Sequence, residues 1–162
     1  MFVGEQPGDR EDREGVPFTG PAGALFDRAL DEAGIDRGAV YVTNVVKHFR
    51  FEERGKRRIH QRPDARHIAA CRPWLEAELA IVRPQVLVCL GATAAQALIG
   101  RQVRVTRDRG RPLDSPLAPD TIVTVHPSSV LRARGDEERR AAYRAFVGDL
   151  EQVAALAGAG RR

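Results

Sequence analysis

The sequence contains little cysteine and no long apolar segment, and both absences exclude classes of protein. Cys71 and Cys89 are the only two cysteines among 162 residues, which is too few for a disulfide framework and fits a reducing compartment. No run of about 18 apolar residues could span a bilayer, and the N-terminus lacks the basic and then hydrophobic segments of a secretory signal. We therefore expect a soluble cytoplasmic protein with no membrane partner.

Glycine-rich phosphate-binding loops are also missing, because neither a G-x-G-x-x-G nor a Walker motif occurs. A generic nucleotide-binding domain is therefore a poor interpretation. The chain does have enough material for one hydrophobic core, since 43% of its 162 residues are hydrophobic. We expect a single domain over residues 1–162 and a monomeric protein.

Positive charge is concentrated in one segment of the chain. The whole sequence has 26 Lys and Arg against 22 Asp and Glu, which gives a net charge of only +4. Between Lys47 and Arg62, however, there are seven basic residues and two glutamates. Such a density suits a polyanion such as nucleic acid, although a solvated surface can give the same pattern.

Apolar runs and amphipathic segments alternate along the chain. Runs typical of buried strands cover residues 1–3, 39–43, 86–90 and 121–125, with a weaker one at 103–106. Segments typical of helices cover residues 21–33, 64–83, 92–99 and 136–157. This alternation predicts a three-layer α/β/α domain around a mostly parallel sheet. The first strand looks truncated, and we expect that an N-terminal segment is lacking.

Two stretches show no regular period. Residues 44–63 are predicted to form a long loop, and a loop of this length in a small domain is often functional. Pro112, Pro116 and Pro119 predict a second, shorter loop.

Polar clusters follow three of the predicted strands. Gly4 to Gly8 follows the first, Asn44 the second, and His126 to Ser129 the last. Ligands of open parallel sheets bind beyond the carboxyl ends of the strands, where such clusters converge. Each cluster alone is compatible with an ordinary turn or strand end. Together they predict a ligand-binding site at the carboxyl ends of the strands.

These clusters carry a resemblance to a known family. Five segments, in this order and with this rough spacing, are similar to the motifs of iron-sulfur uracil-DNA glycosylases: residues 4–8, 17–23, 41–47, 70–75 and 126–129. Gln6 in the first motif and the insertion Lys56-Arg57-Arg58-Ile59-His60 resemble the UdgX group of that superfamily in particular. The resemblance covers essentially the whole chain, and the insertion is its most specific part.

The resemblance implies uracil-containing DNA, single-stranded or duplex, as the partner. Phe18 would stack on a flipped-out uracil, and Asn44 would hydrogen-bond the Watson-Crick edge of the base. Backbone amides around Gln6 would hold the uracil O2 edge, and His126 would donate to the departing base. The implied substrate-binding residues are Gln6, Pro7, Gly8, Phe18, Asn44 and Ser128. The implied DNA-contacting residues are Lys56, Arg57, Arg58 and Ser129.

The UdgX resemblance further implies that the protein ends covalently attached to its product. Glu5 would stabilise the cationic sugar, and the imidazole of His60 would capture that sugar in place of water. A positioned group reaches effective molarities of roughly 10⁵ to 10⁸ M, which lets it compete with solvent. Two alternatives are a conventional hydrolytic uracil-DNA glycosylase and a DNA-binding fragment without catalysis. In isolation, His60 would simply be a surface histidine among arginines.

The metal ligands are where the sequence departs from the iron-sulfur relatives. The resemblance implies a [4Fe-4S] cluster, with His48 at a position where many relatives have cysteine and Cys71 as the last ligand. The upstream Cys-x-x-Cys pair of the relatives is not in this sequence. Because such a cluster takes four ligands, we expect it to be absent or incomplete. Cys89, between Val88 and Leu90, is interpreted as a small buried hydrophobe.

Overall fold

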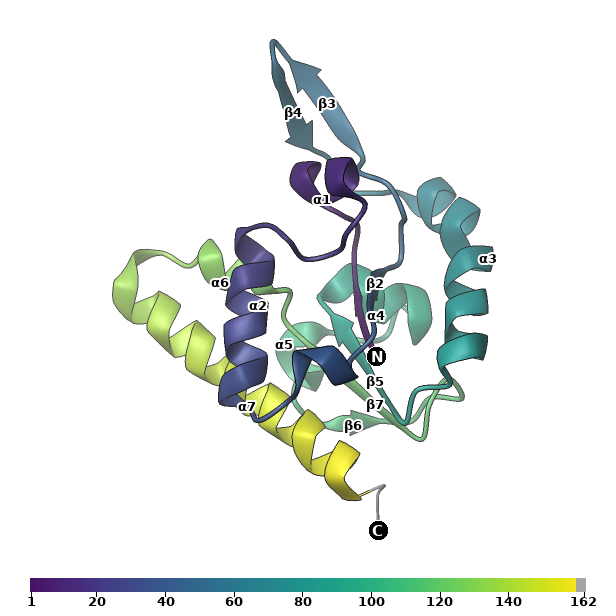
Figure 1. Ribbon diagram of the computed structural model, residues 1–162, viewed down its shortest axis with the longest axis vertical. Helices are drawn as coiled ribbons and strands as arrows, with labels where there is room; N and C mark the ends of the chain where they lie inside the picture. Colours follow the sequence, from purple (N-terminus) through teal and green to yellow (C-terminus); the bar gives the residue numbers. More distant parts are fainter. Residues whose placement is uncertain (160–162) are drawn as a thin grey trace.

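A five-stranded sheet lies at the centre of the computed structural model, which describes residues 1–159 (Figure 1). The strand order is β2-β1-β5-β7-β6. The strands are β1 (Phe2–Gly4), β2 (Val42–Asn44), β5 (Val86–Leu90), β6 (Pro112–Leu113) and β7 (Asp120–Thr124). β1 pairs in parallel with β2 and β5, β5 pairs in parallel with β7, and β6 is an antiparallel edge strand. The sheet is therefore mostly parallel, as predicted.

Helices cover both faces of this sheet. On one face lie α2 (Pro21–Glu32), α6 (Pro127–Leu131) and α7 (Gly135–Ala159), and on the other α3 (Ala65–Val82), α4 (Ala92–Leu98) and α5 (Val105–Asp108). The short helices α1 (Asp9–Glu14) and η1 (Arg37–Ala39) complete the fold. This arrangement confirms the three-layer α/β/α architecture. Within residues 1–159, no helix combines the length and apolar character needed to cross a membrane.

The strand β5 shows how the sequence builds the two cores. All of its residues are buried, and successive side chains point to opposite faces of the sheet. Val88 therefore packs under α2 and α7, whereas Leu87 and Cys89 pack under α3 and α4. Burial raises the pKa of the Cys89 thiol to about 12. Cys89 is thus the buried hydrophobe that the sequence predicts.

Two helix boundaries follow the predicted local chemistry. The Asp64 carboxylate accepts hydrogen bonds from the backbone N–H groups of Arg66 and His67, which satisfies the first turn of α3. After α2, Gly34 adopts a φ of +72°, a conformation that favours glycine. Asp64 as a helix cap and Gly34 as a helix stop are both confirmed.

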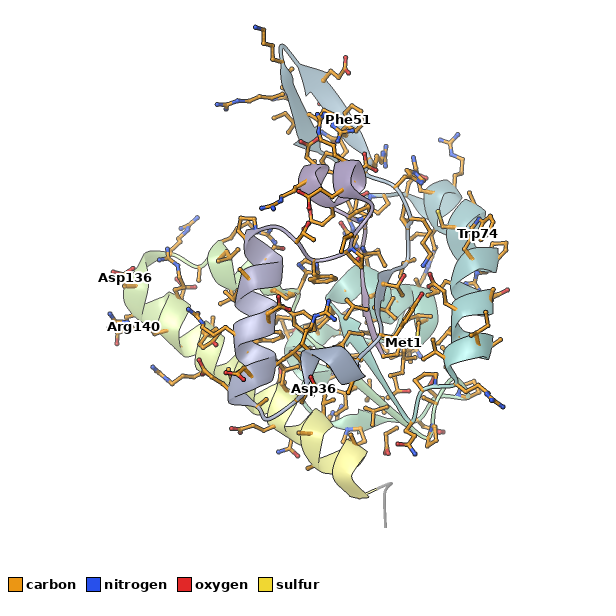
Figure 2. The ribbon with its side chains drawn as sticks, viewed as in Figure 1. Met1, Asp36, Phe51, Trp74, Asp136 and Arg140 are labelled. Atoms are coloured by element: carbon orange, nitrogen blue, oxygen red, sulfur yellow. The ribbon has the colours of Figure 1, made fainter. Side chains whose placement is uncertain are left out.

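The predicted loop at 44–63 contains regular structure, so that prediction is wrong in part. Residues of this segment form an antiparallel hairpin of β3 (Phe51–Arg54) and β4 (Arg57–His60). Gly55, with a φ of +61°, lies in the turn that joins the strands. Figures 1 and 2 show this hairpin projecting from the body of the molecule beyond α1, with Phe51 on it. Every residue of β3 is exposed, so no buried face gives an alternating pattern in the sequence.

Other differences concern short elements. The weak strand predicted at 103–106 is wrong, because α5 begins at Val105 and the Asp108 carboxylate accepts a hydrogen bond from the Arg104 N–H at its start. The second predicted loop contributes β6, whose Pro112 is tolerated because the strand lies at the sheet edge. The helices α1 and α6 were not predicted, and both follow strands at the polar clusters.

Candidate active site

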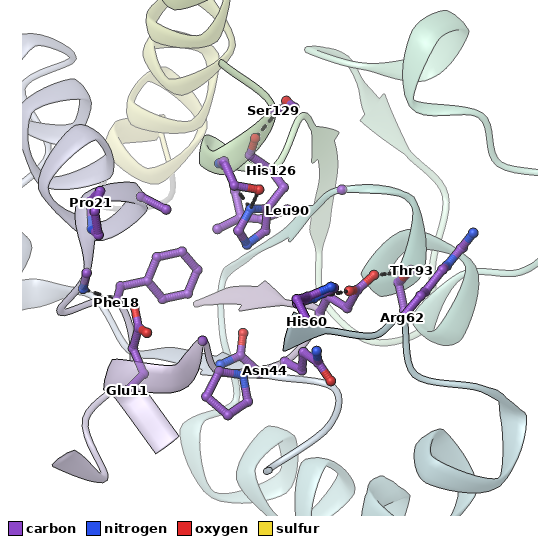
Figure 3. Close-up of a pocket in the computed structure, with 18 of the residues that line it drawn as sticks. Glu11, Phe18, Pro21, Asn44, His60, Arg62, Leu90, Thr93, His126 and Ser129 are labelled. Atoms are coloured by element: carbon purple, nitrogen blue, oxygen red, sulfur yellow. Dashed lines mark hydrogen bonds and ion pairs between the residues drawn. The ribbon is translucent and has the colours of Figure 1, made fainter. Parts of the chain in front are cut away.

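A cavity of about 810 Å³ opens at the carboxyl ends of the parallel strands (Figure 3). All three predicted polar clusters line it, and so do the more distant Phe18 and His60. The predicted site residues on its wall are Glu5, Gln6, Pro7, Gly8, Phe18, Asn44, His60, His126, Ser128 and Ser129. The fold thus brings together side chains that are more than 100 positions apart in the chain, such as Glu5 and His126.

Asn44 lines this cavity and carries an unsatisfied amide oxygen. Its side chain is buried, and Oδ1 has no hydrogen-bond partner within the part of the chain that the structure describes. A Cβ on Gly4 would lie 2.4 Å from that oxygen, so glycine is needed beside it. Lys47 Nζ donates to the Asn44 carbonyl at 2.8 Å and pairs with Glu78 at 2.6 Å. The Lys47 contact holds the backbone of Asn44 in place, and among the described residues its buried Oδ1 is left as an unpaired hydrogen-bond acceptor.

Phe18 lies on the cavity wall in a strained backbone conformation. Its φ is +61°, which is uncommon for an aromatic residue. The helix α2 packs so closely that a Cβ on Gly23 would lie 1.7 Å from the Phe18 carbonyl oxygen. The Phe18 ring centroid is 5.2 Å from that of Phe26 and 5.8 Å from that of His126. This packing fixes an apolar ring face beside the histidine.

His126 is a neutral imidazole with a defined orientation. Burial lowers its pKa from 6.5 to about 4, so the ring carries no charge at neutral pH. Nδ1 accepts a hydrogen bond from the Ser128 N–H at 3.1 Å. The proton of the neutral ring therefore resides on Nε2. Among residues 1–159 that N–H has no hydrogen-bond acceptor, so it can donate to a group in the cavity.

Glu5 lies between two other polar side chains. Its Oε1 is 3.3 Å from Nε2 of His60, and its Oε2 accepts a hydrogen bond from the hydroxyl of Thr93. The His60 side chain is 54% exposed, whereas that of Glu5 is 23% exposed. The histidine is thus accessible from outside while the carboxylate faces the interior of the cavity. The structure therefore places two of the predicted catalytic side chains, Glu5 and His60, in contact.

The Gln6 side chain holds the base of the hairpin. Its Nε2 donates to the Gln61 carbonyl at 3.1 Å, and its Oε1 accepts from the Arg50 N–H at 3.1 Å. Arg50 precedes β3 and Gln61 follows β4, so Gln6 joins the two ends of the hairpin. The sequence analysis predicted a role only for the backbone amide of Gln6. The contacts of its side chain could not be read from the motif, because they depend on which distant segments meet.

The basic residues of the hairpin lie in two different environments. Lys56 and Arg57 are exposed. Arg58, in contrast, is turned inward: its guanidinium pairs with Asp9 and Asp12, and its Cζ lies 4.6 Å above the ring of Phe51. Its side chain is only 18% exposed. The expected contact of Arg58 with DNA therefore competes with an internal role in fastening β4 to α1.

The two predicted metal ligands lie side by side. His48 Nδ1 is 3.7 Å from Cys71 Sγ, which also accepts a hydrogen bond from the Lys47 N–H at 3.3 Å. Within residues 1–159, no group of three or more His, Cys, Asp or Glu side chains could hold a metal ion. Two donors do not fit a [4Fe-4S] cluster, which takes four.

Sequence reasoning missed Thr93, which lies in the first turn of α4 directly after β5. A polar residue just beyond a buried parallel strand was the available signal, because such positions face the ligand side of the sheet. It also missed Glu11, whose carboxylate accepts a hydrogen bond from the Gly20 N–H at 3.0 Å on the cavity wall.

Comparisons with known proteins agree with this geometry. Residues 1–151 match the model of the uracil DNA glycosylase superfamily. The chain is 43% identical over 141 residues to a type-4 uracil-DNA glycosylase of Thermotoga maritima, covering 86% of this chain and 70% of that protein. It is 36% identical over 139 residues to the type-4 uracil-DNA glycosylase of Pyrobaculum aerophilum, covering 82% and 67%. A third similar protein, from Sulfurisphaera tokodaii, is 35% identical over 116 residues, covering 68% and 50%. The chain belongs to the uracil DNA glycosylase superfamily.

Proposed function

We propose that this protein excises uracil from DNA by cleaving the N-glycosidic bond. The observation that carries the proposal is the unpartnered, buried Oδ1 of Asn44 in a cavity that also contains the Phe18 ring and the neutral His126. An orphaned buried acceptor is unfavourable unless a ligand satisfies it. The complementary donor on uracil is N3–H.

The same amide distinguishes uracil from cytosine. Oδ1 of Asn44 accepts from uracil N3–H, and its amide NH₂ donates to O4. Cytosine offers an acceptor at N3 and a donor at its 4-amino group, so both pairs would be mismatched. A site built to hydrogen-bond a substrate rejects an analogue that leaves buried polar groups unpaired. Phe18 stacks on the extruded base and recovers stacking energy lost from the DNA.

Bond cleavage separates charge, and the cavity has a group for each side. The electron pair of the bond between C1′ and N1 leaves with the uracil, and Nε2–H of His126 donates to the uracil oxygen as negative charge develops. The sugar becomes an oxocarbenium-like cation, which the Glu5 carboxylate stabilises. Because His126 is neutral, it donates a hydrogen bond without adding a second positive charge beside that cation.

We further propose that His60 captures the sugar. As the His60 ring leaves Glu5 it takes the Nδ1–H tautomer, which frees the Nε2 lone pair to form a new bond to C1′. The resulting imidazolium then loses its Nδ1 proton to water, which leaves a neutral N-glycosylated ring. The uracil anion takes up a proton as it leaves. The support is the position of Nε2 on the cavity wall, 3.3 Å from Glu5. A neutral imidazole is a poor leaving group, so the adduct persists.

Water is the competing acceptor, and the similarity to type-4 uracil-DNA glycosylases favours it. In that case Glu5 orients a water molecule, and a free abasic site and repeated turnover follow. Both outcomes share the excision step and differ only in the nucleophile.

DNA approaches the cavity along exposed polar groups. Lys56 and Arg57 on the hairpin and Ser129 at the cavity rim contact the phosphate backbone. A basic hairpin beside an open cavity suits an extruded nucleotide from either single-stranded or duplex DNA. Binding should weaken with salt in proportion to the phosphates that are contacted.

The test is incubation with DNA that contains one uracil, in single-stranded and duplex form, with cytosine-containing DNA as the matched control. Uracil release is measured directly, and a denaturing gel detects retarded, heat-stable DNA. We expect release from uracil-containing DNA alone. Salt-dependent binding without release would overturn the excision proposal and identify a DNA-binding module. Release without a retarded band would overturn capture and leave hydrolysis.

A further inference from the structure

The Glu5 carboxylate is contacted at each of its two oxygens by a side chain from a different part of the chain. His60 Nε2 lies 3.3 Å from Oε1, and the Thr93 hydroxyl donates to Oε2. His60 and Thr93 face each other across these contacts in Figure 3. The two partners differ in exposure, because the His60 side chain is 54% exposed on the hairpin whereas Thr93 is 6% exposed on the domain body.

The local structure holds the Thr93 hydroxyl in one place. Thr93 lies in the first turn of α4, after a sharp turn at Gly91 with a φ of +91°. A Cβ on Gly91 would lie 3.2 Å from the Cβ of His126, so this turn also packs against the base-contacting histidine. Threonine is β-branched, which restricts its side chain to few rotamers. The hydroxyl is therefore a rigid donor aimed at Glu5.

We propose that Thr93 is the residue that positions Glu5 for the excision step, an inference that rests on the proposed function. The hydrogen bond to Oε2 stops the carboxylate from rotating, so that Oε1 keeps facing the sugar when His60 leaves it to approach C1′. Without Thr93, the carboxylate would follow the exposed His60 or turn to solvent. Thr93 contacts neither base nor sugar in this scheme. It acts through Glu5 alone.

Replacing Thr93 with valine keeps the shape of the side chain and removes the donor. At saturating DNA, the single-turnover rate of uracil release should fall by roughly 10- to 100-fold, the size expected for a slightly misplaced catalytic group. The dissociation constant for DNA should barely change, because Thr93 is buried and contacts neither base nor phosphate in this scheme. Thr93→Ser retains the hydroxyl and should recover most of the rate. Equal rates for wild type and Thr93→Val would overturn the inference, and so would equal losses in the valine and serine variants.

A double-mutant cycle separates positioning from a general structural effect. In a Glu5→Ala background there is no carboxylate to orient, so Thr93→Val should cause no further loss of rate. A merely structural role for Thr93 would give the same fractional loss in both backgrounds. Losses that multiply independently would therefore contradict the proposal.

The same four proteins, unfolded by denaturant, test the contact without using activity. Removing Thr93 and Glu5 together should destabilise the fold by less than the sum of the two single changes, because they share one hydrogen bond. If wild type releases no uracil, the proposed function fails while this cycle still decides whether Thr93 and Glu5 interact. If wild type is active and the unfolding effects are additive, the contact fails and the proposed function stands.

Discussion

The floor of the cavity and the hairpin beside it are built in opposite ways. The floor residue Asn44 ends β2 and His126 follows β7, and both strands bury their apolar side chains in the cores. The hairpin is exposed along β3 and is fastened to the body through Gln6 and Arg58. A floor of this kind keeps one geometry, whereas a hairpin with few attachments can move. In the proposed mechanism, base recognition thus belongs to the rigid region and the proposed nucleophile His60 to the adjustable one.

The largest expected effect comes from removing a side chain of the cavity floor. His126→Ala removes the donor to the departing base, and the rate of uracil release should fall roughly 10²- to 10³-fold. Capture should fall by the same factor, because it follows excision. Ile81→Ala, at a position that is 80% exposed on α3, is the control and should match wild type. If release stays normal in His126→Ala while capture alone is lost, the division between floor and hairpin is wrong.

The next effect comes from loosening the hairpin. Gln6→Ala removes the hydrogen bonds to Arg50 and Gln61, so His60 is no longer held beside Glu5. The fraction of excised sites that end as adducts should fall by up to about 100-fold, as expected for a nucleophile displaced by roughly 1 Å. Uracil release should fall less. Quantifying free uracil and retarded DNA in one reaction gives this ratio. An unchanged ratio would show that the hairpin does not need this anchor.

The free energy of unfolding should also fall in acid, because His126 in the floor of the cavity is held neutral. Burial holds the pKa of His126 near 4, below the 6.5 of the ordinary side chain. Its contribution to the free energy of unfolding is therefore complete above about pH 6.5 and is lost as the pH falls through 4. We expect a loss of about 2 kcal/mol, less than the full linkage value because the ring faces an open cavity. Denaturant titrations from pH 7 to 4 should show this slope in wild type and a shallower one in His126→Asn.

The smallest expected effect comes from a variant that lowers the stability of the fold without changing the hairpin. Gly34 ends α2 with a φ of +72°, and a Cβ added there would meet nothing within 4 Å, so Gly34→Ala adds backbone strain alone. The expected cost is about 1 kcal/mol of unfolding free energy. The ratio of adduct to free uracil should not change. A lowered ratio would mean that the Gln6→Ala result reports stability and not position.

How much could be predicted from the sequence depended on burial. The strand β5 was predicted with its observed bounds because a fully buried parallel strand is a continuous apolar run. The hairpin was missed because β3 is exposed throughout and no residue of β4 is fully buried, so neither strand gives such a pattern. α5 was predicted as a strand because Val103 and Val105 suggested one. The hydrogen bond from the Arg104 N–H to the Asp108 carboxylate, which starts this helix, forms only in the folded chain.

The candidate site was found through its motifs and not through its contacts. Residues that line the cavity were identified because polar segments at the ends of parallel strands converge. Three contacts could not be predicted from the sequence. They are the hydrogen bond from the Gln6 side chain to the base of the hairpin, the ion pair of Arg58 with Asp9, and the hydrogen bond from Thr93 to Glu5. Each joins segments that are between 44 and 88 residues apart.

The most direct test of the division between a rigid floor and a capturing hairpin is to locate the sugar. The protein is reacted with a short oligonucleotide that contains one uracil, digested with protease and nuclease, and mapped by mass spectrometry. The account predicts a deoxyribose-derived mass on the peptide that contains His60, and its disappearance in His60→Ser while uracil release persists. A free abasic site with no modified peptide, or a modification on another residue, would contradict it.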